Sequence, residues 1–458
     1  MGVFMSEETE LKRELGIGYT TLFGVGLILG AGVYVLTGEA GVLVGDSLWL
    51  SVFFATIIAV LTGLSYAEFA SMYPKAASSH TYVKETFPRR EELAFISGWL
   101  IAFEGIAGAA TAAIGFARYF VGIFSIDFAL VPLIAIIVII ILSFVNWWGV
   151  KESAILILIF TFIEAFGLVF VSVLGLINPV RTSVDYFAVL DKENAFSLVL
   201  IGASIFYFAF TGFELQPTLA EEAKEPRKTV PKAIILALLI CSALYLLVAF
   251  TIVRIYNLPT LGEDDRRRKA VLAYAAGEVG GHVAFLLVAS IALFSTSNTV
   301  LGFLVSSSRL IYGLADERIL PEKLARVHHK TRTPHYAVFA SGIIAVLVII
   351  ITAGLPIVLN LAPRTAEGYE LVLVSIVGQV SSLAALLVFV LINICVVVLR
   401  IRKPEVEREF KVPTIILPIV GAIMTAVFIT SFTVGIVWIT TAIIIVVGIV
   451  LYLMRPKH

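Results

Sequence analysis

Charged residues are scarce in this sequence of 458 residues: they make up 14% of the chain, against about 25% in ordinary soluble domains. Hydrophobic residues account for 59%, and the mean hydropathy is +1.01. A soluble globule of this length has too much surface to cover with so few polar side chains. The composition therefore predicts a polytopic protein embedded in a lipid bilayer. Lys plus Arg and Asp plus Glu both number 33, so no charge excess indicates a nucleic-acid partner.

Cysteine and histidine are nearly absent as well. The two cysteines, Cys241 and Cys395, both lie in apolar runs and are expected to be buried thiols. None of the six histidines has a metal-binding spacing such as H-E-x-x-H. Because the chain also lacks a nucleophile–base pair, we expect no metal, no cofactor and no enzymatic activity.

Long apolar runs are what the sequence has in abundance. A bilayer span needs about 20 mostly apolar residues, and charged breaks divide the chain into twelve candidates, which predicts twelve transmembrane helices. The runs near 93–124 and 281–312 are long and predict either tilted helices or an extra turn in the membrane interface. The candidate spans lie near 16–44, 48–72, 93–124, 129–148, 153–178, 197–220, 231–256, 281–312, 335–355, 370–400, 413–432 and 434–454.

The distribution of positive charge orients these spans. If the polar tail of residues 1–15 is cytoplasmic, most of the 33 Lys and Arg residues fall on the cytoplasmic side, as the positive-inside rule requires. The segment DDRRRK at 264–269 is the exception and would face outward. We therefore expect a multi-pass protein of the cell membrane with both termini in the cytoplasm.

The first span contains the stretch GVGLILGAGVYVLTG, which starts at Gly24 and holds five glycines. Each glycine costs a helix interior about 1 kcal/mol relative to alanine. The cluster predicts a break at Gly30-Ala31-Gly32, in the middle of the membrane. The alternative is that the glycines only allow tight helix packing, a role that we expect for Gly24 and Gly26.

The sixth span, SIFYFAFTGFELQPTLAEE, contains a comparable cluster. Its Thr211-Gly212 pair lies at mid-depth and is followed by Glu214 and Pro217. Interrupted helices in corresponding positions of two repeats are typical of membrane transport sites. The sequence therefore predicts a second break near Phe210-Thr211-Gly212 and favours a transport site over packing.

The two predicted breaks together indicate a ligand. In the first span the outer half would begin at mid-membrane, and its free N–H groups attract an anion such as a carboxylate. In the sixth span the outer half would end there, and its free carbonyl groups attract a cation such as an ammonium group. An α-amino acid carries both groups, so the breaks predict an amino acid as the substrate.

Several motifs, in one order along the chain, resemble those of the amino acid–polyamine–organocation transporter superfamily, and most closely its cationic-amino-acid-transporter-like branch. The similar segments are GLILGAGVYVLTG, SYAEFASMYPKAASSHTYVKETF, NWWGVKESA, AFTGFELQPTLAEEAKEPRKTVPKAI, ASIALFSTSN, SSSRLIYGLADERILPEKLARVHHKTRTPHYA and LRIRKPEVEREFKVP.

The resemblance implies the fold and the activity. We expect an all-α fold with a five-plus-five inverted repeat, in which residues 16–178 form the first repeat and 197–400 the second. The last two spans, at 413–454, lie outside the repeat. The implied activity is secondary active transport of an amino acid by alternating access.

The resemblance also places candidate residues. Glu104 in the third span lies where family members often have an acid near the substrate, and Phe208 and Phe210 lie where the family gates its site with an aromatic side chain. A structural hydrogen bond is the alternative role for Glu104. The candidate substrate-binding residues are Ile28, Gly30, Ala31, Gly32, Glu104, Phe208, Phe210, Thr211 and Gly212.

One departure from the family concerns ion coupling. The family segment that begins G-V-K-E-S-A often carries a lysine fifteen residues after its first glycine, and that lysine is thought to replace a sodium ion and couple transport to protons. Counting from Gly149 gives Glu164 instead. An ionisable side chain inside a span is costly and indicates function. We expect Glu164 to bind the coupling ion together with the hydroxyls of Ser295 and Thr296, with a structural hydrogen bond as the alternative.

The sequence thus predicts an amino acid permease that works as a proton symporter. An exchanger and a sodium-coupled carrier remain open as other modes of transport. A channel is the alternative outside this class, although helix breaks favour an enclosed site over a continuous polar lining.

Overall fold

The computed structural model describes residues 11, 13–124, 126–188, 193–262, 267–268, 270–354, 372–430, 432 and 435–455. These residues are helical and contain no β-strand; an isolated bridge pairs Leu15 with Ala223. The expected all-α class is therefore confirmed. The long helices are α1 (Ile17–Val44), α2 (Leu48–Met72), α4 (Glu91–Phe124), α5 (Val131–Trp148), α6 (Val150–Ile177), α7 (Ala195–Tyr207), α8 (Pro226–Ile252), α10 (Val271–Asp316), α11 (His335–Ile349), α13 (Val372–Arg402), α14 (Ile416–Ile429) and α15 (Gly435–Leu453).

Eleven segments of the described chain are long and apolar enough to cross a membrane, one fewer than expected. The difference arises at the expected span 413–432, where α14 has only 14 residues. The apolar run there begins with Pro413 and Thr414, which precede the helix, and the helix ends before Thr430. The count of twelve spans therefore stays a prediction.

Two connections contain helices that hydropathy did not predict. The polar segment between α2 and α4 forms α3 (Ser78–Thr86), a short helix with most of its residues buried. α10 begins ten residues before the expected span and is interrupted at Gly281, where φ is 71° and ψ is −171°. Both segments carry too few apolar residues to be recognised as spans.

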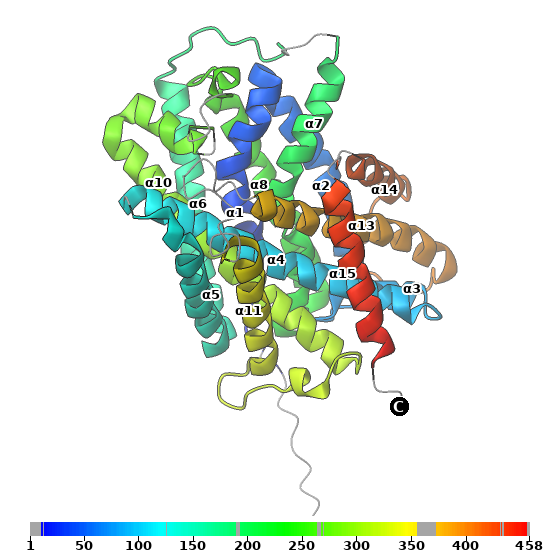
Figure 1. Ribbon diagram of the computed structural model, residues 1–458. Helices are drawn as coiled ribbons and strands as arrows, with labels where there is room; N and C mark the ends of the chain where they lie inside the picture. The colour runs from blue at the N-terminus through cyan, green and yellow to red at the C-terminus, as the bar shows by residue number, and fades with distance from the viewer. Residues whose placement is uncertain are drawn as a thin grey trace, which may run out of the picture.

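α1 lies in the interior of the bundle, where it packs against α6, α7, α8 and α10 (Figure 1). α4 crosses the bundle obliquely and packs against α10 and α13. This oblique course agrees with its length of 34 residues. The connection from α10 to α11 and the end of α15 lie at the bottom of Figure 1, whereas residues 178–188 lie at the top.

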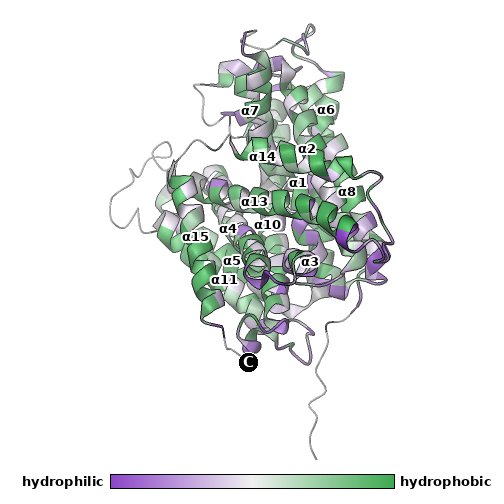
Figure 2. Ribbon diagram, turned by 90° about the vertical axis from the view of Figure 1, so that its right-hand side faces the viewer, coloured by the Kyte–Doolittle hydropathy of each residue, from purple (hydrophilic) through white to green (hydrophobic). Residues whose placement is uncertain are grey.

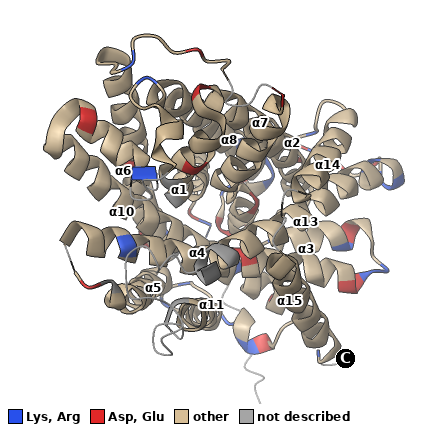
Figure 3. Cartoon of the chain, turned by 45° about the horizontal axis from the view of Figure 1, so that its top comes forward, with Lys and Arg blue, Asp and Glu red and all other residues tan. Residues whose placement is uncertain are grey.

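The outer surface of the bundle is apolar over its middle (Figure 2). Large exposed side chains on the outer helices include Ile140 of α5, Phe162 of α6, Ile343 of α11 and Ile443 of α15. In Figure 3 most of the helical ribbon belongs to residues that are neither basic nor acidic. Such an exterior is suited to contact with lipid.

Candidate functional site

The backbone of α1 leaves helical geometry at Gly30, where φ is 10° and ψ is −166°. This interruption lies within the predicted segment Gly30-Ala31-Gly32. A side chain on Gly30 would collide with the Thr299 hydroxyl, and a Cβ on Gly32 would lie 2.8 Å from the Ala209 Cα. Both positions therefore require glycine for close approach. The side chain of Ala31 lies outside the described residues.

The second interruption follows α7, again where the sequence predicted it. A short 3₁₀ segment, η3 (Phe208–Phe210), leads to Thr211 in extended geometry. Gly212 then has φ 118°, a region that favours glycine, and a Cβ there would lie 2.9 Å from the Leu27 carbonyl oxygen. The chain continues as the 3₁₀ segment η4 (Phe213–Glu222), which contains Pro217, and not as an α-helix.

Tyr245 of α8 joins the two interruptions. Its hydroxyl donates to the Ile28 carbonyl oxygen at 2.6 Å and lies 2.9 Å from the Ala209 carbonyl oxygen. The tyrosine is fully buried, so these contacts satisfy a hydroxyl that has no access to water. The sequence analysis missed Tyr245; the available signal was a tyrosine hydroxyl in an otherwise apolar span, which must find a partner.

The predicted aromatic residues lie beside this junction. The Phe210 ring packs edge-on against Tyr245, with 5.0 Å between ring centroids. Phe208 is only partly buried, and its carbonyl oxygen accepts a hydrogen bond from the Thr211 hydroxyl at 2.8 Å. The junction therefore brings together four of the predicted residues: Ile28, Phe210, Thr211 and Gly212. Phe208 takes part through its backbone carbonyl group.

Glu164 of α6 is fully buried and faces α10. Its Oε2 accepts a hydrogen bond from Asn298 Nδ2 at 3.0 Å, and the Ser295 hydroxyl lies beside the carboxyl. Asn298 Nδ2 also donates to the Thr161 hydroxyl at 3.0 Å. Glu164 Oε1 and Asn298 Oδ1 have no hydrogen-bond partner among the described residues. The site thus offers neutral oxygen atoms around one carboxyl.

Thr296, which was predicted to join Glu164, points elsewhere. Its hydroxyl donates to the Ala292 and Leu293 carbonyl oxygens of its own helix, both at 3.0 Å. Asn298, two residues further along α10, provides the direct contact with Glu164 instead. Gly26 of α1 faces the same cluster, because a Cβ there would lie 2.6 Å from Asn298 Nδ2.

Glu104 of α4 lies beside Glu214 of η4, and both are buried. Glu214 Oε1 accepts a hydrogen bond from the Gly212 N–H at 2.7 Å, so this carboxyl stabilises the second interruption. The remaining oxygens, Glu104 Oε2 and Glu214 Oε2, have no hydrogen-bond partner among the described residues. Two acids therefore lie next to the interruption of the sixth span.

Glu222, another buried carboxyl, has a charged partner. Arg309 of α10 is fully buried, and its Nε donates to Glu222 Oε1 at 3.3 Å. Arg309 also donates to the Asn146 side-chain oxygen of α5. The Glu222 carbonyl oxygen accepts the N–H groups of Glu14 and Leu15, both at 3.0 Å. This network was not predicted from the sequence.

Glu68 near the end of α2 forms ion pairs with two basic residues. Its carboxylate accepts hydrogen bonds from Arg400 and from Arg408. The Val412 N–H also donates to it, at 2.8 Å. This network joins α2 to the end of α13 and does not contact either interruption.

Comparisons with known proteins agree on one family. A family model described as amino acid permease matches residues 15–454. The chain is 28% identical to the branched-chain amino acid permease BcaP of Bacillus subtilis, over 99% of this chain and 95% of that protein. It is 27% identical to the methylthioribose transporter of the same organism, with the same coverage. It is 30% identical to human cationic amino acid transporter 4, over 86% of this chain and 61% of that protein.

Proposed function

This chain belongs to the amino acid permease family, and from that premise we propose that it is a secondary active carrier that moves an amino acid by alternating access. Its relatives are transporters, so the protein is a permease and not an enzyme. Proton symport is the proposed mode. The substrate site lies between the interruptions of α1 and of the sixth span.

The convergence of two carbonyl oxygens carries this proposal. The Ile28 and Ala209 oxygens, one from each interrupted span, lie within 2.9 Å of the same hydroxyl oxygen of Tyr245. Carbonyl groups that meet in this way also suit the three N–H donors of an ammonium group. The substrate ammonium binds these carbonyl groups beside Tyr245.

The substrate carboxylate binds on the other side of the α1 interruption. A helix that restarts after Gly30 presents N–H groups in its first turn, together with the positive end of its dipole. Gly30 and Gly32 allow the ligand to approach this backbone closely. The pair Glu104 and Glu214 lies beside the second interruption, within reach of a substrate side chain or of its ammonium group.

Glu164 binds the coupling proton in this proposal. Its Oε2 has an amide donor in Asn298, and its Oε1 has no hydrogen-bond partner among the described residues. No Lys or Arg of the described chain forms an ion pair with it. A carboxyl in these surroundings is neutral when protonated and costly to hold charged, so a proton stabilises it.

Sodium is the second candidate for coupling, because the same site offers hard oxygen ligands. Glu164 Oε1 and Asn298 Oδ1 have no hydrogen-bond partner among the described residues, and the Ser295 hydroxyl lies beside the Glu164 carboxyl. Oxygen atoms of carboxylate, amide and hydroxyl groups are the ligands that hard cations prefer. Sodium dependence of uptake would favour this candidate over the proton.

The proposal includes the arrangement in the membrane. Residues 16–178 and 197–400 form two inverted repeats, and residues 413–454 add two further spans. Both termini are cytoplasmic, in the cell membrane. In support, the segment from α10 to α11 and the end of α15 lie at the same end of the bundle (Figure 1).

Counterflow in proteoliposomes tests the proposal. Vesicles are loaded in turn with each of the twenty amino acids, and entry of a trace of the same labelled amino acid is followed at pH 5.5 and 7.5, with and without sodium. We expect saturable counterflow for a subset of amino acids and accumulation driven by an inward proton gradient. Linear, non-saturable flux without counterflow would indicate a channel and contradict the proposal.

A further inference from the structure

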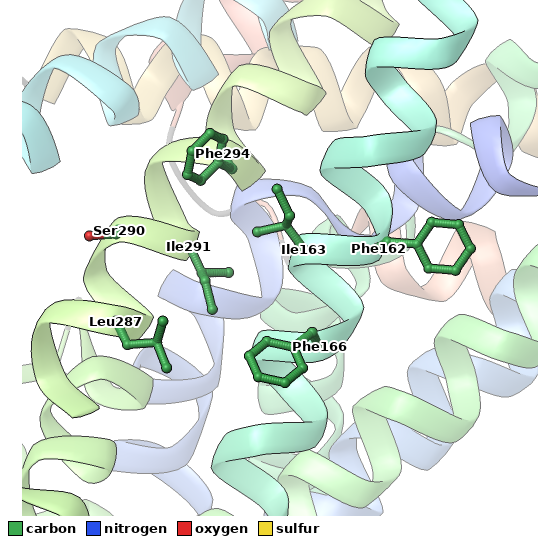
Figure 4. Close-up of a pocket in the computed structure, with 7 residues that line it drawn as sticks. All are labelled: Phe162, Ile163, Phe166, Leu287, Ser290, Ile291 and Phe294. Atoms are coloured by element: carbon green, nitrogen blue, oxygen red, sulfur yellow. The ribbon is translucent and has the colours of Figure 1, made fainter. Parts of the chain in front are cut away.

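A crevice between α6 and α10 opens to the outside of the bundle (Figure 4). Its volume is about 340 Å³, and it is lined by Phe162, Ile163 and Phe166 of α6 and by four residues of α10 between Leu287 and Phe294. In Figure 4, Ile163 and Phe166 point toward Leu287 and Ile291 on the facing helix. The crevice therefore separates two helices that carry the Glu164 cluster.

Two contacts between the helices lie beside the crevice. The ring centroids of Phe160 and Phe294 are 5.5 Å apart. A Cβ on Gly167 would lie 2.7 Å from Ile291 Cγ2. The two helices therefore touch each other next to the crevice, which is a local gap between them.

The walls of the crevice are apolar and continuous with the outer surface. Phe162 is 57% exposed and Phe166 is 55% exposed. Ser290 is the one polar residue among those that line it, and none is charged. A polar ligand or a lipid headgroup would find no counter-charge here, whereas a hydrocarbon ligand fits the walls.

The position of the crevice along α6 indicates which part of a lipid reaches it. Phe162 lies 12 residues after Val150, the first residue of α6, and Phe166 lies 11 residues before Ile177, the last. A helix of this length spans a hydrocarbon layer about 30 Å thick. The crevice is thus near the middle of the layer, where the ends of acyl chains lie and headgroups do not.

We propose that this crevice is a binding site for the terminal part of a phospholipid acyl chain. A void between two helices in a bilayer forfeits dispersion contacts on every wall, and a flexible chain end restores them. The chain end lies against Ile163, Phe166 and Ile291. Because Ile291 and Ser295 are four residues apart on α10, the bound chain lies one helical turn from the Glu164 cluster.

Photolabelling with two phospholipids tests the site. The protein is reconstituted in phosphatidylcholine vesicles that contain a trace of phosphatidylcholine with a diazirine near the end of one acyl chain. A parallel sample has the diazirine next to the headgroup. After illumination and digestion, mass spectrometry compares labelling of residues 160–167 and 287–294 with labelling of Ile439 to Val447 on α15, which is similarly exposed. We expect at least threefold enrichment in the crevice for the chain-end probe and none for the headgroup probe.

Two variants separate a bound chain from general contact with lipid. Leu287→Trp fills the crevice, because the Leu287 side chain points toward α6 (Figure 4), and it is expected to remove the enrichment. Leu239→Trp adds the same ring to the exposed face of α8 and leaves the enrichment intact. Leu287→Phe fills less space and serves if the larger side chain prevents folding. Labelling proportional to exposure, or unchanged in both Leu287 variants, overturns the proposal. Enrichment with a diazirine sterol but not with the phospholipid, or cross-links between two copies of the chain at this position, overturns it as well.

Discussion

Glu164 and Glu222 are both fully buried carboxyls, but their surroundings differ. Glu222 forms an ion pair with the buried Arg309, which Asn146 and Ser308 also hold. Glu164 has only neutral partners: the amide of Asn298 and the neighbouring Ser295 hydroxyl. A buried charge paired with an opposite charge is fixed in place, because neither group can change its ionisation alone. A buried carboxyl among neutral groups can bind and release a proton, so the two sites suit structure and transport respectively.

The largest expected effect comes from replacing Glu164, the carboxyl with only neutral partners, by a side chain that does not ionise. Glu164→Gln keeps a hydrogen-bonding side chain of the same size and cannot exchange a proton. We expect accumulation driven by a pH gradient to fall to the level seen without a gradient, while counterflow at equal pH persists. Thr296→Val is the matched control, because the Thr296 hydroxyl is already committed to its own helix. Unchanged pH-driven uptake in Glu164→Gln would contradict the assignment.

The second largest effect tests the paired site. Arg309→Met leaves Glu222 as a buried, uncompensated charge, which costs about 3–5 kcal/mol of folding stability. The double variant Glu222→Leu/Arg309→Met removes both charges, and we expect it to recover most of this loss. Unfolding of the detergent-solubilised protein provides the measurement. Lys84→Ala, which breaks a half-exposed pair with Glu317, should cost less than about 1 kcal/mol. Equal losses in the two single variants would remove the distinction between buried and exposed pairs.

His80 provides a third test, because it is an ionisable side chain that belongs neither to the Glu164 site nor to the Glu222 site. Burial in α3 lowers the pKa of His80 to about 4, below the value of about 6.5 in an unfolded chain. The unfolded state therefore binds the proton more readily, so stability is full above pH 6.5 and falls as the pH drops toward 4. We expect His80→Phe to abolish about 3 kcal/mol of this pH dependence.

The control for this prediction is the exposed His282, where the same substitution should leave the pH dependence of unfolding unchanged. Transport assays also distinguish the titration of His80 from that of Glu164. If His80→Phe, like Glu164→Gln, abolished pH-driven uptake, proton coupling could not be assigned to Glu164 alone.

The smallest effect concerns the junction of the interrupted spans. Tyr245→Phe removes the donor shared by the Ile28 and Ala209 carbonyl oxygens. Loss of a partner for buried groups costs about 1–2 kcal/mol, and we expect amino acid affinity to fall about five- to thirtyfold. Tyr82→Phe is the matched control, since the buried Tyr82 hydroxyl has no hydrogen-bond partner among the described residues. Titration of binding by calorimetry provides the measurement; equal affinities in the two variants would contradict the role of Tyr245.

Hydropathy predicted most of the helices. The thickness of the bilayer sets how long an apolar run must be to form a span, so a span can be recognised from the composition of the run alone. The interruptions at Gly30 and Gly212 were predicted for a related reason. Glycine and its neighbours act on the local backbone, so a cluster in an apolar run is visible without knowledge of tertiary contacts. α14 differed from expectation because the apolar run continues past both ends of the helix.

Partners across helices could not be predicted in the same way. Asn298 and Thr296 are two residues apart on α10, and only the direction of each side chain decides which one reaches Glu164. Arg309 and Glu222 are 87 residues apart, and Tyr245 meets a carbonyl group 217 residues away. Such contacts depend on helix rotation and tilt, which a single sequence does not specify.

The close contact between Gly32 and Ala209 has a consequence for binding strength. If the substrate binds between the interruptions as proposed, it has to separate these two residues, and binding then selects a population in which they are apart. The apparent affinity would equal the intrinsic affinity multiplied by the fraction of molecules in that form. With one molecule in about a hundred in that form, the observed Kd would be about a hundredfold weaker than the contacts alone would give. In the proposed carrier, the contact between Gly32 and Ala209 would thus set part of the affinity.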